Sequence, residues 1–158
     1  MDEKKKEEVR YDLSGGYALT AAIREIVNGY PQLREGESVA FATLSETGGL
    51  ALYPGTGGII EKETRSVTGK VRQICRYPFV VVLRAGGLSE NGRAAAKERL
   101  DDLARWLERL RAFPALSEER KLLGFAIQTP ACLDDVDDSH VETWAVGLAA
   151  RYENIYQK

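Results

Sequence analysis

The stretch Tyr77-Pro78-Phe79-Val80-Val81-Val82-Leu83-Arg84 decides the fold of this chain. It is apolar, rich in β-branched residues and much shorter than the roughly 20 residues of a membrane-spanning helix, so it predicts a buried strand. Ala85-Gly86-Gly87 interrupts it, and Ser89 then opens the longest helical pattern in the sequence. Spacings of four and three residues place one apolar stripe on a single helix face: Ala96, Leu100, Leu103, Leu107 and Leu110. A central strand therefore leads into a long amphipathic helix that must cover a sheet.

Elements on both sides of this stretch complete an α+β pattern. Residues 17–30 predict a helix whose apolar positions share a face, and Pro31 ends it because the residue before a proline avoids the helical region. Residues 39–44 and 50–54 predict two strands, and Ser45-Glu46-Thr47-Gly48-Gly49 predicts a hairpin turn between them.

The last third of the chain predicts a strand pair. The alternation over 122–129 directs Leu123, Phe125 and Ile127 inward, and Pro130 closes the strand. Residues 132–140 form an acidic loop, and residues 142–156 form a long final strand that pairs antiparallel with its predecessor. The predicted fold is α+β: a mixed, mainly antiparallel sheet covered by an N-terminal helix and one long central helix.

Length and charge narrow the functional classes. The 158 residues suffice for one domain, 1–158, in which residues 1–12 form a charged, flexible N-terminal tail. The 22 basic and 24 acidic residues nearly cancel, which does not favour a nucleic-acid binder. We expect no membrane segment and no secretory leader, because residues 1–8 lack an apolar region. We interpret Cys75 and Cys132 as free thiols in a reducing cytoplasm rather than as a disulfide.

Residues 59–76 form the least core-like segment, a charged hairpin or arm. Alternation places Ile60, Lys62 and Thr64 on one face and charged residues on the other, so neither face is apolar throughout. One interpretation is an exposed edge ribbon whose charges discourage aggregation, and the other is an arm that contacts a neighbouring subunit. The turn is expected near Ser66-Val67 or Thr68-Gly69.

Motifs that would indicate catalysis or a cofactor are incomplete. His140 has no second histidine or suitably spaced cysteine to complete a metal site, and we interpret it as a bystander at a strand start. The run Asp134-Asp135-Val136-Asp137-Asp138 lacks the central glycine of a calcium loop; a solvated loop, a loose cation site or an assembly surface remain open. Gly86-Gly87 precedes a helix but lacks the rest of a dinucleotide fingerprint, which favours turn glycines. We expect no enzyme and no cofactor or metal.

The order of elements carries a resemblance. Leu52-Tyr53-Pro54, Tyr77-Pro78-Phe79, the helix from Asn91 to Arg111 and the closing strand from Trp144 to Tyr152 follow one another in the same order as in the tail terminator proteins of long-tailed bacteriophages. The chain resembles this minor-capsid or tail-completion family of phages and prophages over residues 17–156. The resemblance implies a non-catalytic virion protein at the head–tail junction, assembled in the bacterial cytoplasm.

The same resemblance implies the partners. Such proteins form a hexameric ring that caps the tail tube protein, ends tail polymerisation and offers its other face to a head-completion protein. DNA passes through the ring without sequence-specific binding, which an acidic wall would favour. One heterologous interface repeated until it closes would build the ring.

Two surfaces follow as hypotheses. The subunit interface is expected on the charged arm, at Glu61, Glu63, Arg65, Lys70 and Arg72. A negative surface toward the lumen or a partner is expected at Asp134, Asp135, Asp137 and Asp138. The competing functions are another virion assembly protein, such as a head–tail connector or a tail tube subunit, and a small enzyme of unrecognised type.

Overall fold

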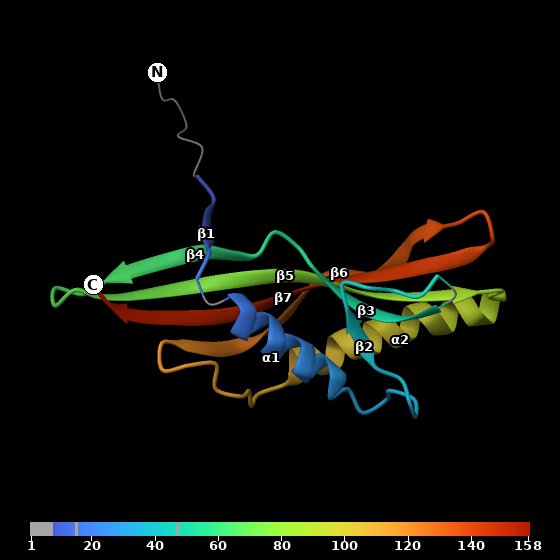
Figure 1. Ribbon diagram of the computed structural model, residues 1–158, viewed down its shortest axis with the longest axis horizontal. Helices are drawn as coiled ribbons and strands as arrows, with labels where there is room; N and C mark the ends of the chain where they lie inside the picture. Colours follow the sequence, from blue (N-terminus) through green and yellow to red (C-terminus); the bar gives the residue numbers. More distant parts are fainter. Residues whose placement is uncertain (1–7, 15, 47) are drawn as a thin grey trace, which may run out of the picture.

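The computed structural model describes residues 8–14, 16–46 and 48–158. The protein is a mixed α+β molecule with a mostly antiparallel sheet, and the described residues form two helices (Figure 1). In chain order the elements are β1 (Arg10–Asp12), α1 (Gly16–Asn28), β2 (Val39–Phe41), β3 (Gly48–Pro54), β4 (Gly58–Arg65), β5 (Lys70–Gly86), α2 (Glu90–Arg109), β6 (Arg120–Val136) and β7 (Val141–Gln157).

Strands β5 and β7 form the axis of the elongated molecule. They pair antiparallel along their whole length, from Lys70 opposite Gln157 to Gly86 opposite Val141. β6 pairs with the other edge of β7, as the sequence predicts for the last two strands. The predicted strand at Tyr77 is therefore only the second half of a 17-residue strand.

The second edge of β5 is shared by two strands in turn. β4 pairs with it from Val71 to Arg76, and β3 pairs with it from Phe79 to Ala85. Pro78 lies where one partner ends and the other begins, and its carbonyl accepts a hydrogen bond from the Gly55 amide. A proline in a central strand normally loses a ladder bond, but here the missing N–H falls in the gap between two partners.

The short strand β2 corrects the predicted hairpin. β2 pairs with β3 in parallel, with Val39 opposite Leu50 and Phe41 opposite Leu52. The expectation of a hairpin around residues 45–49 is therefore wrong. A parallel partner requires the chain to return to the start of the next strand. Ala42 has a φ of 53°, and its amide donates to the Leu52 carbonyl, which turns the chain out of β2.

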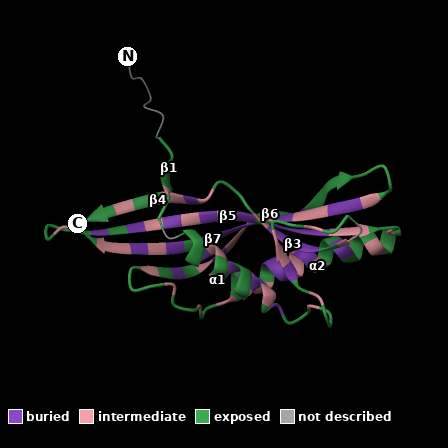
Figure 2. Cartoon of the chain, in the orientation of Figure 1, coloured by how far each residue is buried: buried purple, intermediate pink, exposed green. Residues whose placement is uncertain are grey.

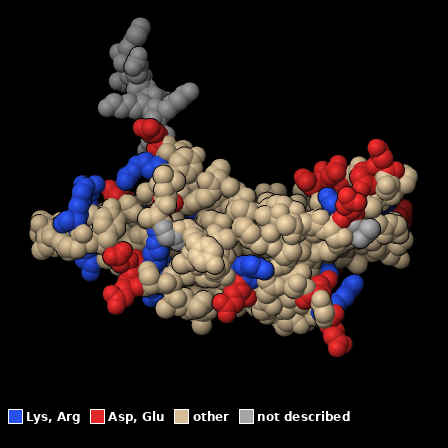
Figure 3. Space-filling view, in the orientation of Figure 1, with Lys and Arg blue, Asp and Glu red and all other residues tan. Residues whose placement is uncertain are grey.

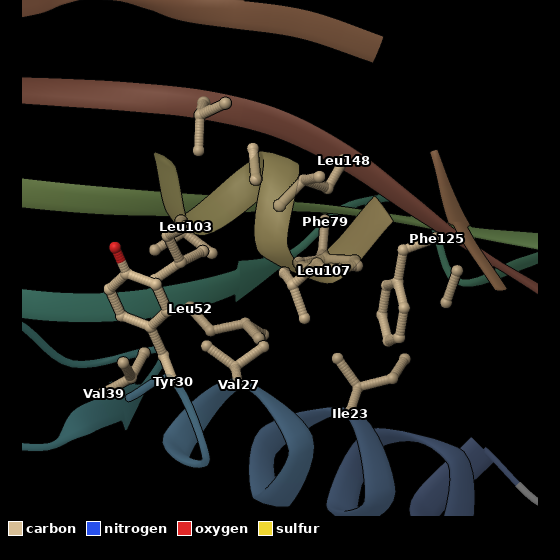
Figure 4. Close-up of a cluster of buried hydrophobic side chains, with 14 of the residues drawn as sticks. Ile23, Val27, Tyr30, Val39, Leu52, Phe79, Leu103, Leu107, Phe125 and Leu148 are labelled. Carbon is tan, nitrogen blue, oxygen red and sulfur yellow. The ribbon is translucent and has the colours of Figure 1, made fainter. Parts of the chain in front are cut away.

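The core collects apolar side chains from both helices and the long strands. Leu19, Ile23 and Val27 of α1 are buried, and so is the predicted stripe of α2 except for Leu110, which caps the helix C-terminus. Ser89 is the N-cap, and its side chain accepts a hydrogen bond from the Gly92 amide. Figure 4 shows Ile23 and Val27 pointing toward Phe79, Leu103 and Leu107.

The alternation of β5 defines two sides of the sheet. Every odd-numbered residue from Val71 to Leu83 is buried, whereas Arg72 and Val80 on the opposite side are exposed (Figure 2). We call the buried side the core side and the other the outer side. Directly opposed residues share a side in an antiparallel pair, so the register assigns the residues of β4, β6 and β7 to the same two sides.

Strand β6 departs from the predicted pattern in three ways. Register shifts interrupt its pairing with β7, the first between Leu122 and Gly124. Because the extra residue reverses the alternation, Leu122 is buried and Leu123 is exposed, so the inward assignment of Leu123 is wrong. Pro130 lies within another irregularity and does not close the strand. β6 continues to Val136, so Asp134 and Asp135 lie on a strand and not in the predicted loop.

The N-terminal segment also differs from expectation. A flexible tail through residue 12 is wrong for Arg10–Asp12, which form β1 and pair antiparallel with β4. The first seven residues of that predicted tail lie outside the described residues. The segment 59–76 forms the hairpin of β4 and β5, but it is no free arm, because β7 pairs along the other edge of β5. Both cysteines are free, with Cys75 buried and Cys132 exposed.

Candidate functional site

Charged side chains gather at the two ends of the long strands. Figure 3 shows Asp and Glu clustered over the turn between β6 and β7, whereas Lys and Arg, interspersed with Asp and Glu, lie over the other end. The turn lies at the start of β7, and the β4–β5 hairpin lies beside the end of β7. The two predicted surfaces are therefore on opposite ends of the molecule.

The first surface is the acidic tip, which we define as Asp134, Asp135, Asp137 and Asp138. All four residues are exposed, and among the described residues no cation lies within ion-pair distance of them. Only Asp137 organises the turn: its Oδ1 accepts hydrogen bonds of 2.9 Å from the amides of Ser139 and Val141. The tip therefore holds four carboxylates together, three of them with no hydrogen bond in the described structure.

Next to the tip, the buried carboxylate of Glu142 lies opposite Val136 and forms an ion pair with Arg93. Arg93 of α2 donates from Nε to both carboxylate oxygens of Glu142, at 2.9 and 3.1 Å. The Glu142 side chain is only 3 % exposed, so this carboxylate is satisfied inside the molecule. His140 is the last residue of the turn before β7; its φ is 60°, and its side chain is exposed. Two exposed apolar residues flank the tip, Leu133 and Val136.

The second predicted surface does not form one patch. Glu63 and Arg65 lie opposite Gln73 and Val71 on the core side of the sheet. Lys70 and Arg72 lie on the outer side with Gln157 and Ile155. The sequence grouped these residues because they are close along the chain, but the alternation of the strands separates them.

Glu63 is engaged within the molecule. Gln73 donates to it at 2.8 Å, Arg10 at 3.2 Å and Arg65 at 3.3 Å. The hydrogen bond from Gln73 and then that from Arg10 lower the pKa of the Glu63 carboxyl to about 2. Glu63 therefore connects β1, β4 and β5 and is a fold contact rather than a free interface residue.

The outer side of the same end carries a different group, which we call the basic face. It consists of cations from four strands: Lys62, Lys70, Arg72, Arg76, Lys121 and Arg151. Only two carboxylates accompany them on these strand positions. Glu153 accepts from Arg72 at 2.6 Å, and Glu61 lies 3.5 Å from Arg76 and 3.9 Å from Arg151.

The sequence analysis missed four members of the basic face. These cations are far apart in the sequence, and the register of the four paired strands brings them together: Lys62 on β4, Arg76 on β5, Lys121 on β6 and Arg151 on β7. The bulge between Ile60 and Lys62 moves Glu61 toward the two arginines that it partly neutralises. A bulge of this kind leaves no reliable signal in the sequence alternation.

A buried polar network ties β1 to the core side at this end. Arg120 contacts both oxygens of Asp12, and the same carboxylate accepts from Tyr152 at 2.8 Å and from Asn154 at 3.0 Å. Burial alone would raise the pKa of Asp12, but hydrogen bonds from Asn154 and Tyr152 and the Arg120 charge outweigh it, so the pKa is lowered. Burial and the bond to Asp12 raise the pKa of Tyr152. The network is a fixed structural anchor.

An open groove of about 560 Å³ lies between residues 113–119 and the facing ends of β6 and β7. Cations and carboxylates both line it, including Arg111, Glu118 and Lys121. Within residues 8–14, 16–46 and 48–158, no three His, Cys, Asp or Glu side chains are grouped as metal ligands would be. None of the helices described is both long and apolar enough to cross a membrane.

The chain matches no model of a known protein family, and no curated protein matches it significantly.

Proposed function

We propose that this protein is a structural component of a long-tailed bacteriophage, which caps the tail tube as a hexameric ring and ends its polymerisation. In this role it meets the tail tube protein on one face and a head-completion protein on the other, at the head–tail junction of the virion. DNA passes through the ring without sequence-specific contact. The proposal assigns an assembly role and no catalysis.

One observation carries the proposal: the segments that resemble the tail terminator family are neighbours in space. Pro54 of the Leu52-Tyr53-Pro54 motif is opposite Phe79 of the Tyr77-Pro78-Phe79 motif. Phe79 is in turn opposite Leu148 of the closing strand. Short motifs that lie at random in a sequence would not be expected to line up across three adjacent strands.

The two helices that are expected to cover the sheet are part of the same proposal. The sequence pattern predicts that an N-terminal helix and one long central helix cover the sheet, and the resemblance implies a mixed sheet with helices packed on it. The burial of Ile23 and Val27 from α1, and of Leu103 and Leu107 from α2, in one cluster with Phe79 supports that arrangement.

The distribution of charge supports an assembly role. A ring of identical subunits needs two different surfaces that fit each other, because each copy uses one surface toward each neighbour. The acidic tip and the basic face are two such surfaces, opposite in sign and on opposite ends of the molecule. Among the described strands β6 pairs with β7 alone, so one edge of β6 has no strand partner.

Native mass spectrometry over a concentration series, with negative-stain imaging of the largest species, tests the proposal. We expect a closed ring of six copies with an open centre. Added tail tubes of the parent phage should acquire one such ring at an end and should stop growing. Open tubes of this protein alone would replace the proposal with a tail tube subunit. A monomer that also fails to bind tube ends would overturn it.

A further inference from the structure

The basic face carries more positive charge than the isolated chain neutralises. Six cations share these strand positions with two carboxylates, Glu61 and Glu153. Arg76 is directly opposite Arg151, and like charges in this position destabilise a sheet. The Glu61 carboxylate forms an ion pair with both arginines, at 3.5 Å from Arg76 and 3.9 Å from Arg151. The Nε of Arg76 has no hydrogen-bond partner among the described residues. A partner with carboxylates would relieve this repulsion.

The acidic tip has the complementary imbalance. Its four carboxylates lie within five residues of sequence, and the described structure offers them no cation. The tip and the basic face of one molecule cannot meet, because Val141 and Glu153 are twelve residues apart on a straight strand. At about 3.3 Å for each residue, the separation is about 40 Å. Any contact between the two surfaces must therefore join two molecules.

We propose that the acidic tip of one copy docks on the basic face of the next, in a repeated head-to-tail contact. The inference rests on the proposed self-assembly and names its interface. Cations outnumber carboxylates on the face, and the tip carries carboxylates alone, so docking reduces the net charge of both surfaces. The contact is heterologous, which generates either a closed ring or an open chain. Exposed Leu133 and Val136 accompany the tip and supply apolar area.

A second copy fits this face better than a nucleic acid does. The whole chain has a formal net charge of −2, so its long-range field does not attract phosphates. The strand alternation also leaves apolar Ile74 and Ile155 between the cations, both partly exposed on the outer side. These side chains suit the apolar residues that flank the tip. Binding to DNA is an outcome that the test below separates.

Two charge-reversed variants carry the test. Asp134→Lys/Asp135→Lys/Asp138→Lys reverses the tip, because it leaves three lysines against one aspartate. Lys62→Glu/Lys70→Glu/Lys121→Glu reverses the face, because it leaves five carboxylates against three cations on these strand positions. None of these six side chains has an ion pair or side-chain hydrogen bond in the described structure, so both variants should fold. Each variant alone would place like charges together. We expect its self-association, measured by sedimentation velocity, to weaken at least about 100-fold.

Mixing the two variants gives the decisive measurement. The reversed tip then matches the reversed face, and the two unreversed surfaces also match each other. We expect equimolar mixing to restore assemblies in which the two variants alternate, which native mass spectrometry resolves by mass. The variant that carries all six reversals should assemble alone. The matched control for the reversed tip, Glu25→Lys/Glu98→Lys/Glu108→Lys, makes the same change in net charge on exposed helix positions and should assemble like the unmodified chain.

The salt dependence of assembly and the binding of duplex DNA are the remaining measurements. Assembly should weaken between about 10 mM salt, where charges act over about 30 Å, and about 1 M, where they act over about 3 Å. The docking is overturned if the single reversals still assemble, if mixing restores nothing, or if the unmodified chain stays monomeric at low salt. Binding of duplex DNA that is lost only in Lys62→Glu/Lys70→Glu/Lys121→Glu would also overturn it. If mixing restores an open chain or a ring of another size, docking stands and the tail-terminator function fails.

Discussion

The two groups of carboxylates at opposite ends of this molecule have the same chemistry but differ in their burial and in their hydrogen-bond and ion-pair partners. Asp12 and Glu63 are largely shielded, contact arginines and accept several hydrogen bonds. Asp135 and Asp138 are exposed and have no such partners among the described residues. The difference shows that the carboxylates which stabilise the fold contact arginines that are distant in sequence, whereas the aspartate run is available for a partner.

The strongest test of this contrast removes the carboxylate of Asp12. Asp12→Ala leaves Arg120 almost buried without its counter-ion, because the two side chains are only 6 % and 10 % exposed. We expect the free energy of unfolding to fall by about 3 kcal/mol, measured by urea denaturation. The matched change Asp135→Ala at the acidic tip should stay within about 0.5 kcal/mol. Equal effects at the two sites would remove the distinction.

Two glycine-to-alanine substitutions, one next to the Asp12 network and one away from it, test this network without changing a charge. A Cβ on Gly58 would overlap the Tyr152 hydroxyl, which must then leave Asp12. We expect Gly58→Ala to lower the free energy of unfolding by about 2 kcal/mol. A Cβ on Gly124 of β6 would meet no atom within 4 Å, so Gly124→Ala should be neutral or slightly stabilising. Thermal unfolding of the two variants measures the difference, and a tolerated Gly58→Ala would show that the anchor is adaptable.

Acid titration gives the smallest expected effect. The folded pKa of Glu63, about 2, lies below its ordinary value of 4.5. Its contribution is therefore complete above about pH 4.5 and is lost as the pH falls toward 2. Glu63→Gln should be less stable by about 1 kcal/mol at pH 7 and should equal the unmodified chain near pH 2. Urea midpoints across this range measure the effect, and an unchanged acid slope in the variant would contradict it.

Sequence reasoning was most successful where one periodicity continues without interruption. The stripe of α2 from Ala96 to Leu107 and the final strand β7 both appear in the structure at the predicted positions. The reason is that each element packs one regular face against the core, so its pattern repeats undisturbed. Ser89 also acts as the predicted start of α2, because its hydroxyl accepts from the Gly92 amide.

The failures occur where the backbone is irregular or changes its partner. The register shift after Leu122 reversed the inward assignment of Leu123. Pro130 was expected to end a strand, yet it lies where the ladder is already displaced, so the strand continues past it. The parallel pairing of β2 with β3 depends on a return path that no local pattern encodes.

The candidate site was predicted only in part. The acidic tip is contiguous in sequence, so composition was sufficient to identify it. The basic face is assembled from β4, β5, β6 and β7, and its membership depends on register rather than on spacing along one segment. The charges of residues 59–76 predict an interface position for Glu63, and its partner Arg10, 53 residues away, leaves no local signal in the sequence.

The uninterrupted pairing of β5 with β7 has a mechanical consequence. A force applied along the strands loads their ladder in shear, because antiparallel hydrogen bonds lie perpendicular to the strand direction. The bonds between Lys70 and Gly86 and their partners then share the load together and do not open one after another. The molecule therefore acts as a stiff strut, which transmits tension or compression from the acidic tip to the basic face with little extension.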